Sequence, residues 1–525
     1  MLTASVLFSS NLFAAPPTGT NTVEQWGIFE IALNGPTNGD PFLDVQFSAT
    51  FSNGLKTVEV SGFYDGNGVY RVRFMPDRTG VWHYVTHGNS PSLDRQTGSF
   101  AVTAATGNNH GPVRVHDTYH FAYADGTVYY PVGTTCYNWL QAPDDWQEQT
   151  LRTLAGASFN KVRFLVFPQN RDFKDNSVPK TPSVPPALLP FEGQPRKDWD
   201  YTRFSPEFFQ KLEQRVGQLR DLGIEADVIL FSPYCSSWGF DKMDAATDDR
   251  YLRYITARLS AYRNVWWSMA NEFDHLKTKN MADWDRFFQV VQKADPYDHL
   301  RSVHNGFIIY DNSQPWVTHA SMQNSAAVRH PGQAALLRDK WHKPVVFDEV
   351  NYEGNETRRW GQLTPEEMIR RIWLGTVNGT YVEHGECYLS TNDTWLSYGG
   401  VLRGGSPPRL AFLRKIFETV PGYGLDPLPA DPEMELGGQP GKYYLLYFDD
   451  KTPSSWSFAL PHDGLANGMK FHVDVIDTWN MTITPVDGVY TVKANADKIF
   501  VDRDGRAVNL PGKPYIALRI IPVKS

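Results

Sequence analysis

Cysteine is scarce in this sequence: the 525 residues include only Cys136, Cys235 and Cys387. An odd count of three is not a disulfide framework, and their spacing matches no zinc-binding motif. Free cysteine is among the residue types that proteins bury most often. We therefore expect all three to be small, buried residues.

Long apolar runs, long basic runs and several catalytic motifs are also missing. After the first fifteen residues, no segment approaches the roughly 18 unbroken apolar residues of a membrane-spanning helix. The formal net charge is −8, and a nucleic-acid-binding surface would need clustered Lys and Arg. Neither H-E-x-x-H nor G-x-S-x-G occurs, which argues against a metalloprotease-like site and a serine hydrolase. We expect no metal and no cofactor, and the sequence gives no indication of the oligomeric state.

The first 21 residues read as a signal-like segment. The stretch MLTASVLFSSNLFAA is short and apolar and ends in small residues suited to cleavage. The positively charged start of such signals is missing. We expect an exported protein, secreted or periplasmic.

Three segments with different sequence patterns follow. Residues 22–110 contain period-2 stretches such as FLDVQFSATF, separated by turn sequences such as NGPTNGD, and predict a β-sandwich. Residues 111–425 alternate strands with amphipathic helices, which predicts a parallel sheet. Residues 426–525 return to strand patterns such as KFHVDVIDTW and predict a second β-sandwich.

The middle segment has the strand count and length of a (β/α)₈ barrel, which usually spans about 250 residues. A doubly wound open sheet would more often have fewer strands, and no G-x-G-x-x-G follows the first strand. The fold class is therefore α/β, a TIM barrel between two β-sandwiches. The eight strand candidates are residues 129–139, 159–168, 223–233, 264–272, 299–306, 316–324, 343–350 and 380–389.

Helix signals lie between most of these strands. The clearest helix follows Ser205, a candidate N-cap, with Pro206 in the first turn and apolar residues at helical spacing as far as Leu222. Thr364 opens another helix as part of a capping box with Glu367. Further helices fit residues 144–155, 248–262, 281–294 and 406–418.

Acidic residues end two of the predicted strands. The fourth, NVWWSMANE, ends with Glu272, and the seventh, KPVVFDEV, offers Asp348 and Glu349. A barrel carries its chemistry at the carboxyl ends of its strands, and strands four and seven lie nearly opposite each other. Because side chains alternate along a strand, only one of Asp348 and Glu349 is expected to face the barrel axis.

Two carboxyl groups aimed across one pocket are what the hydrolysis of a glycosidic bond requires. One protonates the leaving oxygen, and the other attacks the anomeric carbon or activates water. A carboxylate at a strand end can also cap a helix or pair with an arginine, so either acid alone would be weak evidence. Both acids at opposed strand tips, each after an apolar run, favour a catalytic pair.

The Asn-Glu pair after the fourth strand and the glutamate of the seventh resemble clan A retaining glycoside hydrolases. More narrowly, FMPDRTGVWHYVTHGNSPSLDRQTGSFAV followed by HGPVRV, the first strand GTTCYNW and the late β-domain resemble the layout around apiosidase-like catalytic barrels of bacterial polysaccharide-degrading enzymes. This resemblance covers most of the chain from about residue 22. It implies that Glu272 is the acid/base, Glu349 the nucleophile and Asn271 a ligand of the sugar 2-hydroxyl. It also implies a plant or algal polysaccharide or oligosaccharide as the substrate.

Arg163 stands among apolar residues of the second strand, where an unpaired charge would be very costly. The resemblance implies that Arg163 pairs with Glu349; the alternative is a salt bridge elsewhere. Such pairing would keep Glu349 ionised, as a nucleophile must be, whereas the acid needs a raised pKa.

Polar and aromatic residues at the other strand ends are candidate sugar contacts, and each could equally be a core residue. Trp139 and Trp238 are the stronger candidates for stacking on a sugar. The full set is Tyr137, Asn138, Trp139, Tyr234, Trp238, His304, Asn305, His319, Gln323, Tyr352, His384 and Glu386. The stretch 168–200, with repeated prolines, excludes a regular helix and is expected to wall the substrate cleft or to be a solvated insertion.

Two other function classes stay open. The first is a catalytically inactive barrel that binds carbohydrate, although the retention of both acids argues against it. The second is a metal-dependent hydrolase on a similar barrel, which would need His and Asp clusters at ligand spacing. The residues identify neither the sugar nor the linkage, nor whether the action is exo or endo.

Overall fold

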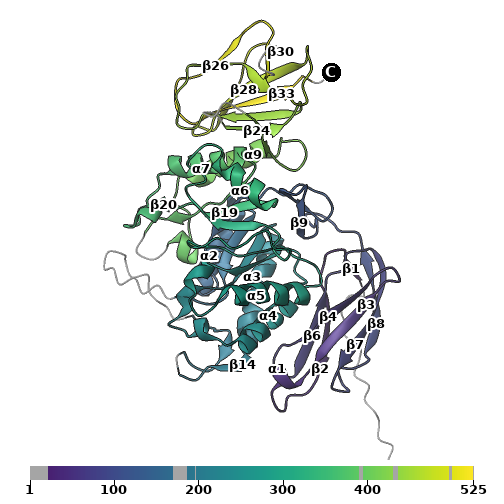
Figure 1. Ribbon diagram of the computed structural model, residues 1–525. Coiled ribbons are helices and arrows are strands. Elements are labelled where there is room, and N and C mark those ends of the chain that lie inside the picture. The colour runs from purple at the N-terminus through teal and green to yellow at the C-terminus, as the bar shows by residue number, and fades with distance from the viewer. Residues whose placement is uncertain are drawn as a thin grey trace, which may run out of the picture.

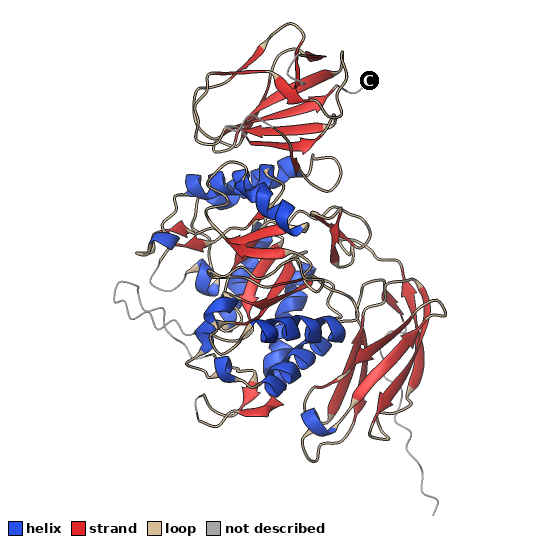
Figure 2. Ribbon diagram, viewed as in Figure 1, coloured by secondary structure: helices blue, strands red, loops and turns tan. Residues whose placement is uncertain are grey.

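The computed structural model describes residues 22–169, 186–195, 197–389, 394–429, 435–495 and 499–523. The signal-like segment and residues 170–185 of the proline-rich stretch therefore lie outside the described residues. A central α/β domain carries one β-domain towards each end of the chain (Figure 1). Strands occupy the middle of this central domain, and helices surround them (Figure 2).

The N-terminal domain is a sandwich of a five-stranded sheet, ordered β1-β8-β7-β3-β4, and a three-stranded sheet, ordered β2-β6-β5. Alternating buried side chains of both sheets form its core, in which the rings of Phe51 and Phe74 stack at 4.2 Å. The predicted sandwich is confirmed. Its elements are β1 (Thr22–Glu24), β2 (Phe29–Asn34), α1 (Pro41–Asp44), β3 (Phe47–Ser52), β4 (Thr57–Ser61), β5 (Phe63–Tyr64), β6 (Val69–Phe74), β7 (Gly80–Gly88) and β8 (Thr97–Thr103).

The central domain is a parallel barrel. Strands β11-β12-β15-β16-β17 form one run and β18-β19-β21 the other. A bridge between Thr134 and His384 joins the last strand to the first, and the amide of Thr318 donates to Arg301 O at 2.9 Å across the other junction. All eight predicted strands are present: β11 (Gly133–Thr135), β12 (Lys161–Leu165), β15 (Glu225–Phe231), β16 (Val265–Ala270), β17 (Arg301–Ser302), β18 (Ala320–Gln323), β19 (Val345–Glu349) and β21 (Tyr381–Val382).

Helices follow most of the barrel strands. All the predicted helices are present. Between β17 and β18, in the fully described segment 303–319, the chain forms turns and no helix. Sequence reasoning missed α6, whose first turn lacks a side-chain cap. The helices are α2 (Asp144–Gly156), α3 (Pro206–Asp221), α4 (Ala245–Leu259), α5 (Met281–Ala294), α6 (Gln333–Trp341), α7 (Pro365–Val377), α8 (Trp395–Tyr398) and α9 (Ser406–Phe417), with 3₁₀ turns η1 (Pro233–Cys235), η2 (Phe240–Lys242), η3 (Phe273–His275) and η4 (Arg359–Gly361).

The helix caps agree with the sequence only in part. Thr364 accepts a hydrogen bond from the amide of Glu367 at 3.2 Å, as a capping residue does. Ser205 occupies the N-cap position of α3, but its hydroxyl makes no capping hydrogen bond. The first turn of α3 instead relies on Pro206, whose ring fixes the backbone angle and which has no N–H to satisfy.

A hairpin closes the amino-terminal end of the barrel. It consists of β9 (Val113–His116) and β10 (His120–Tyr123). The ring of Phe121 lies 5.2 Å from those of Trp266 and Tyr381, which both stand near the beginnings of their strands. The carboxyl ends of the strands are therefore the candidate location of the binding site. Four small strands pair outside the barrel sheets: β13 (Phe191–Glu192) with β14 (Asp200–Phe204), and β20 (Glu353–Gly354) with β22 (Glu386–Cys387).

The C-terminal domain is a curled antiparallel sheet. Its nine strands include β24 and β25 near one end of the order and β31 and β27 at the other. Buried residues from both ends share one core, so the sheet curls back on itself. The nine strands are β23 (Asp426–Pro427), β24 (Glu435–Gln439), β25 (Tyr443–Tyr447), β27 (Ala459–Pro461), β28 (Lys470–Asp477), β29 (Thr482–Pro485), β30 (Tyr490–Ala494), β31 (Ile499–Asp502) and β33 (Ile516–Pro522). A separate two-stranded sheet consists of β26 (Ser455–Ser457) and β32 (Ala507–Asn509).

This domain packs directly on the barrel beside α7 (Figure 1). Tyr443, Leu445 and Tyr447 of β25 belong to the same buried cluster as the barrel core. The ring of Tyr447 stacks on Trp373 of α7 at 5.5 Å. The expectation that the C-terminal domain buries an apolar face against the barrel is therefore confirmed.

The remaining global expectations concern cysteines and membranes. Cys136, Cys235 and Cys387 are buried and free of disulfides, as predicted. Within the part of the chain that the structure describes, none of the helices combines the length and the apolar character needed to cross a membrane.

Candidate active site

Glu272 stands at the carboxyl end of β16, where the chain turns sharply into η3. Its φ of 43° lies in the left-handed region, which is rare for a residue with a side chain and is often found at functional sites. The amide of Asn271 still continues the ladder to Phe231 O at 3.1 Å, and the amide of Phe273 bonds to His304 O at 3.0 Å. Neighbouring strands on both sides thus hold this turn in place.

The Glu272 carboxylate has different partners on its two oxygens. Tyr234, from η1, donates its hydroxyl hydrogen to Oε2, and Nδ1 of His275 lies 3.7 Å from the same oxygen. With its amide oriented to satisfy both neighbours, Gln323 donates to Oε1 at 2.9 Å and to Asn305 O at 3.1 Å. The side chain of Glu272 is 13% exposed, so the carboxylate remains open to the mouth.

Glu349 ends β19 and is more deeply buried, with a side chain 7% exposed. Tyr137 donates its hydroxyl hydrogen to Oε1, while Nε2 of His304 lies 3.4 Å and Nη1 of Arg163 3.8 Å from that oxygen. Burial raises the pKa of Glu349 to about 7, although the neighbouring Tyr352 hydroxyl acts in the opposite direction.

The expectation that only one of Asp348 and Glu349 faces the barrel interior is wrong. Asp348 contacts Lys161 and Arg163 inside the barrel, while Glu349 contacts Tyr137 and His304 nearer the mouth. The register explains this: Ser321 pairs with Val346, but Gln323 pairs with Glu349, so β19 has one extra residue. Such a bulge breaks the alternation and re-aims a side chain.

Asn271, Arg163 and Tyr137 connect the two acids. Oδ1 of Asn271 lies 3.1 Å from the Tyr137 hydroxyl oxygen and 3.4 Å from Nη2 of Arg163. The same hydroxyl donates to Glu349. The residue next to Glu272 in sequence is therefore linked through one hydroxyl to Glu349, which stands on the opposite side of the barrel.

Arg163 lies near two other carboxylates as well as Glu349. Its Nε lies 3.8 Å from both Asp227 and Asp348. Burial alone would raise the pKa of Asp348, but the Arg163 and Lys161 cations hold it well below its usual range. The predicted pairing of Arg163 with Glu349 is therefore present, but the guanidinium is shared with two other carboxylates, and burial raises the pKa of Glu349.

A buried ion cluster lies below the two acids, and sequence reasoning missed it. Nζ of Lys161 lies 2.7 Å from both Asp227 and Glu383 and 3.4 Å from Asp348. Its members come from β12, β15, β19 and the residue that directly follows β21. The signal in the sequence was a charged residue within each of the apolar strands NKVRF, EADVILF and TYVEHG.

His304 lies between this cluster and Glu349. Its Nδ1 is 3.2 Å from the hydroxyl of Ser321 and 3.4 Å from Asp348, and its Nε2 faces Glu349. Burial, together with the Arg163 charge, lowers the pKa of His304. The imidazole is therefore neutral near pH 7 and packs against the nucleophile candidate without adding a positive charge.

Several other predicted contacts lie at the mouth. Tyr352 is buried beside Glu349, and its ring packs edge-on against Trp360 at 5.6 Å. Oδ1 of Asn138 accepts from the amide of Gln169 at 2.9 Å, which makes it a support of the loop after β12. Trp238 is partly exposed after β15, and its carbonyl accepts from Trp199 at 2.6 Å.

The structure places four predicted contacts away from the mouth. Trp139 is fully buried and donates to Gln147 O at 3.2 Å, so neither ring face is free for a sugar. His384 is fully buried against Phe159, and His319 packs on Trp266 towards the closed end. Glu386 accepts from the amides of Arg403 at 2.6 Å and Gly404 at 2.8 Å, which fixes a loop.

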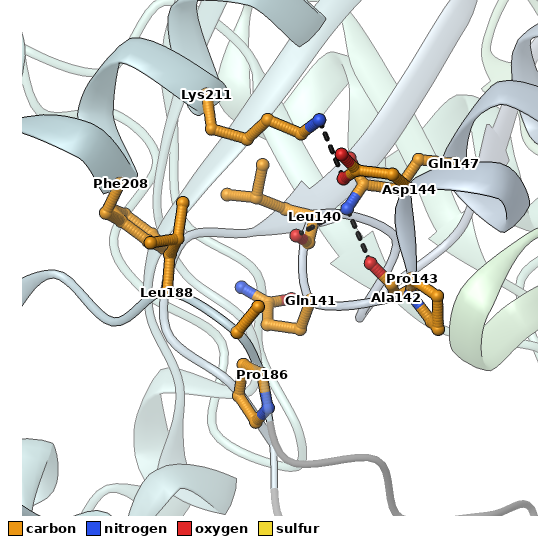
Figure 3. Close-up of a pocket in the computed structure, with 11 residues that line it drawn as sticks. Leu140, Gln141, Ala142, Pro143, Asp144, Gln147, Pro186, Leu188, Phe208 and Lys211 are labelled. Carbon is orange, nitrogen blue, oxygen red and sulfur yellow. Dashed lines mark hydrogen bonds and ion pairs between the residues drawn. The ribbon is translucent and has the colours of Figure 1, made fainter.

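A cavity of about 270 Å³ lies between the loop after β11, residues 186–188 and the start of α3 (Figure 3). Lys211 and Asp144 form an ion pair at 2.7 Å on its rim. Neither Glu272 nor Glu349 is among its lining residues: Leu140, Gln141, Ala142, Pro143, Asp144, Gln147, Pro186, Ala187, Leu188, Phe208 and Lys211.

The described residues contain no candidate metal-binding site. Three or more His, Cys, Asp or Glu side chains do not come together there in a way that could hold a metal ion. The acidic groups of the barrel instead pair with Lys161 and Arg163.

Comparisons with known proteins identify the family of the chain. A family profile described as the apiosidase-like catalytic domain matches residues 116–388, just over half of the chain. Two domains of unknown function, DUF5060 and DUF5605, match residues 22–89 and 433–521. Among curated proteins, none matches this sequence.

Solved structures give the same picture. A protein from Bacteroides vulgatus ATCC 8482, provisionally described as a glycoside hydrolase, is 42% identical with a TM-score of 0.90; the match covers 96% of this chain and 100% of that one. A glycoside hydrolase family 5 protein from the same strain is 13% identical with a TM-score of 0.59, covering 79% and 94%. Another glycoside hydrolase is 12% identical with a TM-score of 0.54, covering 79% and 97%, and these last two show the fold alone.

The barrel, its two carboxylates and these matches define the class of protein: a glycoside hydrolase with a TIM barrel. The chain belongs to the apiosidase-like family, with its catalytic domain between a DUF5060 and a DUF5605 domain.

Proposed function

We propose that this protein is a retaining glycoside hydrolase that uses Glu349 as the nucleophile and Glu272 as the acid/base. The observation that carries the proposal is the convergence of the two carboxylates on one mouth. Gln323, which donates to Glu272 at 2.9 Å, pairs in register with Glu349, and burial together with the charges of both acids raises the pKa of Tyr352. Retaining enzymes need two carboxyl groups about 5–5.5 Å apart, and inverting ones about 6.5–9.5 Å. We expect the shorter separation.

The different surroundings of the two acids fit two different roles. Glu349 is the more enclosed, and Tyr137, Arg163 and His304 fix its oxygen in position for attack. Glu272 is more exposed and is held by neutral donors, Tyr234 and Gln323. An acid/base must reach both the leaving group and the incoming water, so the more open carboxylate suits that role.

The reaction proceeds in two displacements. Glu349 attacks the anomeric carbon, the bond to the leaving oxygen breaks, and Glu272 gives that oxygen its proton. Glu272, now ionised, takes a proton from water, whose oxygen attacks the same carbon and releases Glu349 as a carboxylate. In this proposal Asn271, whose position is supported by contacts with Tyr137 and Arg163, binds the sugar 2-hydroxyl.

The substrate in this proposal is a plant or algal polysaccharide or oligosaccharide. The family description makes apiosides the first glycosides to test. We also propose that the protein is exported, because a polymer must be cut outside the cell or in the periplasm; fractionation of the producing cells tests this.

A panel of aryl glycosides, including the apioside, and of polysaccharides identifies the substrate by product release. Glu349→Gln and Glu272→Gln should each lower turnover on the natural substrate by at least about 10²-fold, as expected for a positioned acid or base. The loss in Glu272→Gln should shrink for dinitrophenyl glycosides, whose leaving group needs no proton. Near-normal turnover of either variant on the natural substrate would refute the assignment, and an inactive carbohydrate-binding barrel would show no turnover in the wild type.

A further inference from the structure

An apolar loop is exposed at the mouth of the barrel. Phe307, Ile308 and Ile309 follow β17 and are 86%, 53% and 38% exposed. Single exposed apolar residues are common on protein surfaces, but contiguous ones mark a binding surface more often. This loop stands at the carboxyl end of a barrel strand, the face on which such barrels bind their ligands.

A buried carboxylate fixes the loop in place. Asp274, only two residues after Glu272, has a side chain that is 3% exposed. Its oxygens accept from the amides of Gly306 at 2.5 Å, Phe307 at 2.8 Å and Ile308 at 3.0 Å. The position of Phe307 relative to Glu272 is therefore set by η3 itself, and the loop offers its apolar side chains without having to reorganise.

His275 connects the loop to the acid/base. Its ring centroid lies 5.2 Å from that of Phe307, and its Nδ1 lies 3.7 Å from Oε2 of Glu272. Gly306 packs tightly on the same imidazole, because a Cβ there would approach Nε2 to 2.6 Å. A continuous row of side chains therefore runs from Phe307 through His275 to Glu272.

The two oxygens of Glu272 show on which side of the substrate this row lies. Oε1 faces Gln323, which pairs in register with Glu349, whereas Oε2 faces His275 and the loop. A general acid stands between the sugar attacked by the nucleophile and the departing group. Phe307 therefore lies on the side of Glu272 opposite to Gln323, the side assigned here to the leaving group.

We propose that Phe307, with Ile308 beside it, binds the leaving group of the substrate by contacting the flat apolar face of a ring next to the scissile oxygen. The inference rests on the proposed function, because it takes Glu272 as the acid. The ring is the C–H face of a sugar in an oligosaccharide or the face of a phenol in an aryl glycoside. The contact determines which leaving groups are accepted, while the chemistry belongs to Glu272 and Glu349.

The test compares leaving groups on the sugar that the substrate panel identifies. Three donors are used: the glycosyl fluoride, the 4-nitrophenyl glycoside and the glycoside of a second sugar. Phe307→Ala should lower kcat/KM for the two ring-bearing donors by about tenfold more than for the fluoride, the order expected for one lost apolar contact. Leu55→Ala, which removes an 83% exposed side chain from the N-terminal domain, is the matched control and should leave all three values unchanged.

A second readout uses the reverse direction of the same step. With the fluoride as donor, an alcohol attacks the anomeric carbon of the glycosyl–Glu349 ester, its proton passes to Glu272, and Glu349 leaves as the carboxylate. Phe307→Ala should lower transfer to benzyl alcohol relative to methanol by several-fold, because only benzyl alcohol carries a ring. The 4-nitrophenyl and sugar donors show which kind of ring the surface prefers.

The outcomes separate this inference from the proposed function. Equal losses on all three donors, or no loss on any, would overturn the role of Phe307 while Glu272→Gln and Glu349→Gln still abolish turnover. Near-normal turnover in those two variants would refute the proposed function itself, whatever the effect of Phe307→Ala on kcat/KM. Because Phe307 is exposed, its replacement should not prevent folding.

Discussion

At the scale of single residues, the site depends on how the surroundings of two glutamates differ. Glu349 is enclosed by Tyr137, His304 and Arg163, and burial raises its pKa to about 7. Glu272 is held in a left-handed backbone conformation with one side open. In the proposed mechanism the same residue type therefore takes two roles in two environments, as in other catalytic carboxylate pairs.

The pKa of Glu349 predicts the pH dependence. A nucleophile must be ionised, so kcat/KM should fall as the pH falls through about 7, where Glu349 takes up its proton. Tyr137→Phe removes a hydrogen bond that stabilises the carboxylate form, which raises the pKa. The acid limb of the kcat/KM profile should then move to higher pH by about one unit, because a hydrogen bond to a charged group contributes about 1.5 kcal/mol.

The control for this profile is Tyr84→Phe, in the N-terminal domain. Its hydroxyl lies on a different domain from the site, so the acid limb should stay where it is in the wild type. An acid limb that stays fixed, or moves to lower pH, in Tyr137→Phe would show that this hydroxyl does not stabilise the ionised Glu349.

The sequence predicts residues at the mouth wherever it predicts where a strand ends. A parallel barrel gathers the carboxyl ends of all its strands at one mouth, so Asn271, Tyr137 and Gln323 could be named without knowing their contacts. The positions of Trp139 and His384 could not be foreseen, because spacing along a strand does not show whether a ring turns into the core. Phe307 could not be predicted as a contact, because an exposed loop has no periodic sequence pattern.

At the scale of elements, β19 shows where pattern reasoning fails. Alternation allows either Asp348 or Glu349 inside, but the bulge against β18 brings both inward. Asp348 then joins the ion cluster, and Glu349 remains above it at the mouth. A register shift of this kind depends on the pairing of two strands, which a single sequence does not reveal.

The ion cluster also ties strands together. Lys161 of β12 bridges Asp227 of β15 and Glu383 after β21, and Gly133 leaves space for the Glu383 carboxylate. Lys161→Met keeps the length of the side chain but leaves two buried carboxylates without their cation. It should lower the free energy of unfolding by roughly 3–5 kcal/mol, as when one partner of a buried ion pair is removed. Urea denaturation measures the difference.

Lys56→Met is the matched control for that variant. Lys56 pairs with Asp77 at 2.7 Å, but both side chains are about two-fifths exposed. Water already solvates such a pair, so its loss should change the free energy of unfolding by less than about 1 kcal/mol. Similar small changes in both variants would mean that the barrel cluster contributes little to stability.

At the scale of the whole molecule, the two β-domains are attached to the barrel in different ways. The N-terminal domain packs on α3 and α4 through buried ion pairs: Arg73 contacts Glu213 of α3, and Asp65 contacts Arg258 of α4. It also reaches β14 near the mouth, where Arg203 donates to Gly39 O at 2.8 Å. That this domain helps long substrates to bind stays a prediction, and comparing long and short substrates after its removal tests it.

The C-terminal domain is expected to stabilise the barrel. Removing residues 426–525 would expose the face of α7 that holds Trp373, and would leave Arg370 without Asp449, which it contacts at 2.5 and 2.7 Å. The truncated protein should be insoluble or unfold at a clearly lower temperature. Arg370→Ala keeps the apolar contact, so it should stay soluble and lose only a few degrees in Tm.

A soluble truncated barrel with an unchanged unfolding temperature would refute the stabilising role. Domain layout was readable from the sequence because strand and helix patterns change at the borders. The contacts between domains could not be predicted from the sequence. Arg370 and Asp449 lie 79 positions apart, and no local sequence pattern marks either of them as a contact.

The central claim is that Glu349 forms a covalent bond to the sugar. The most direct measurement is mass spectrometry of the wild-type protein after incubation with the 2-deoxy-2-fluoro glycosyl donor of the sugar that it cleaves. This donor slows the second displacement and lets the glycosyl-enzyme accumulate. We predict one added glycosyl group, located after proteolysis on the peptide that contains Glu349, and no such group in Glu349→Gln. An adduct on Asp348 or Glu272, or turnover with no adduct in the wild type, would contradict the account.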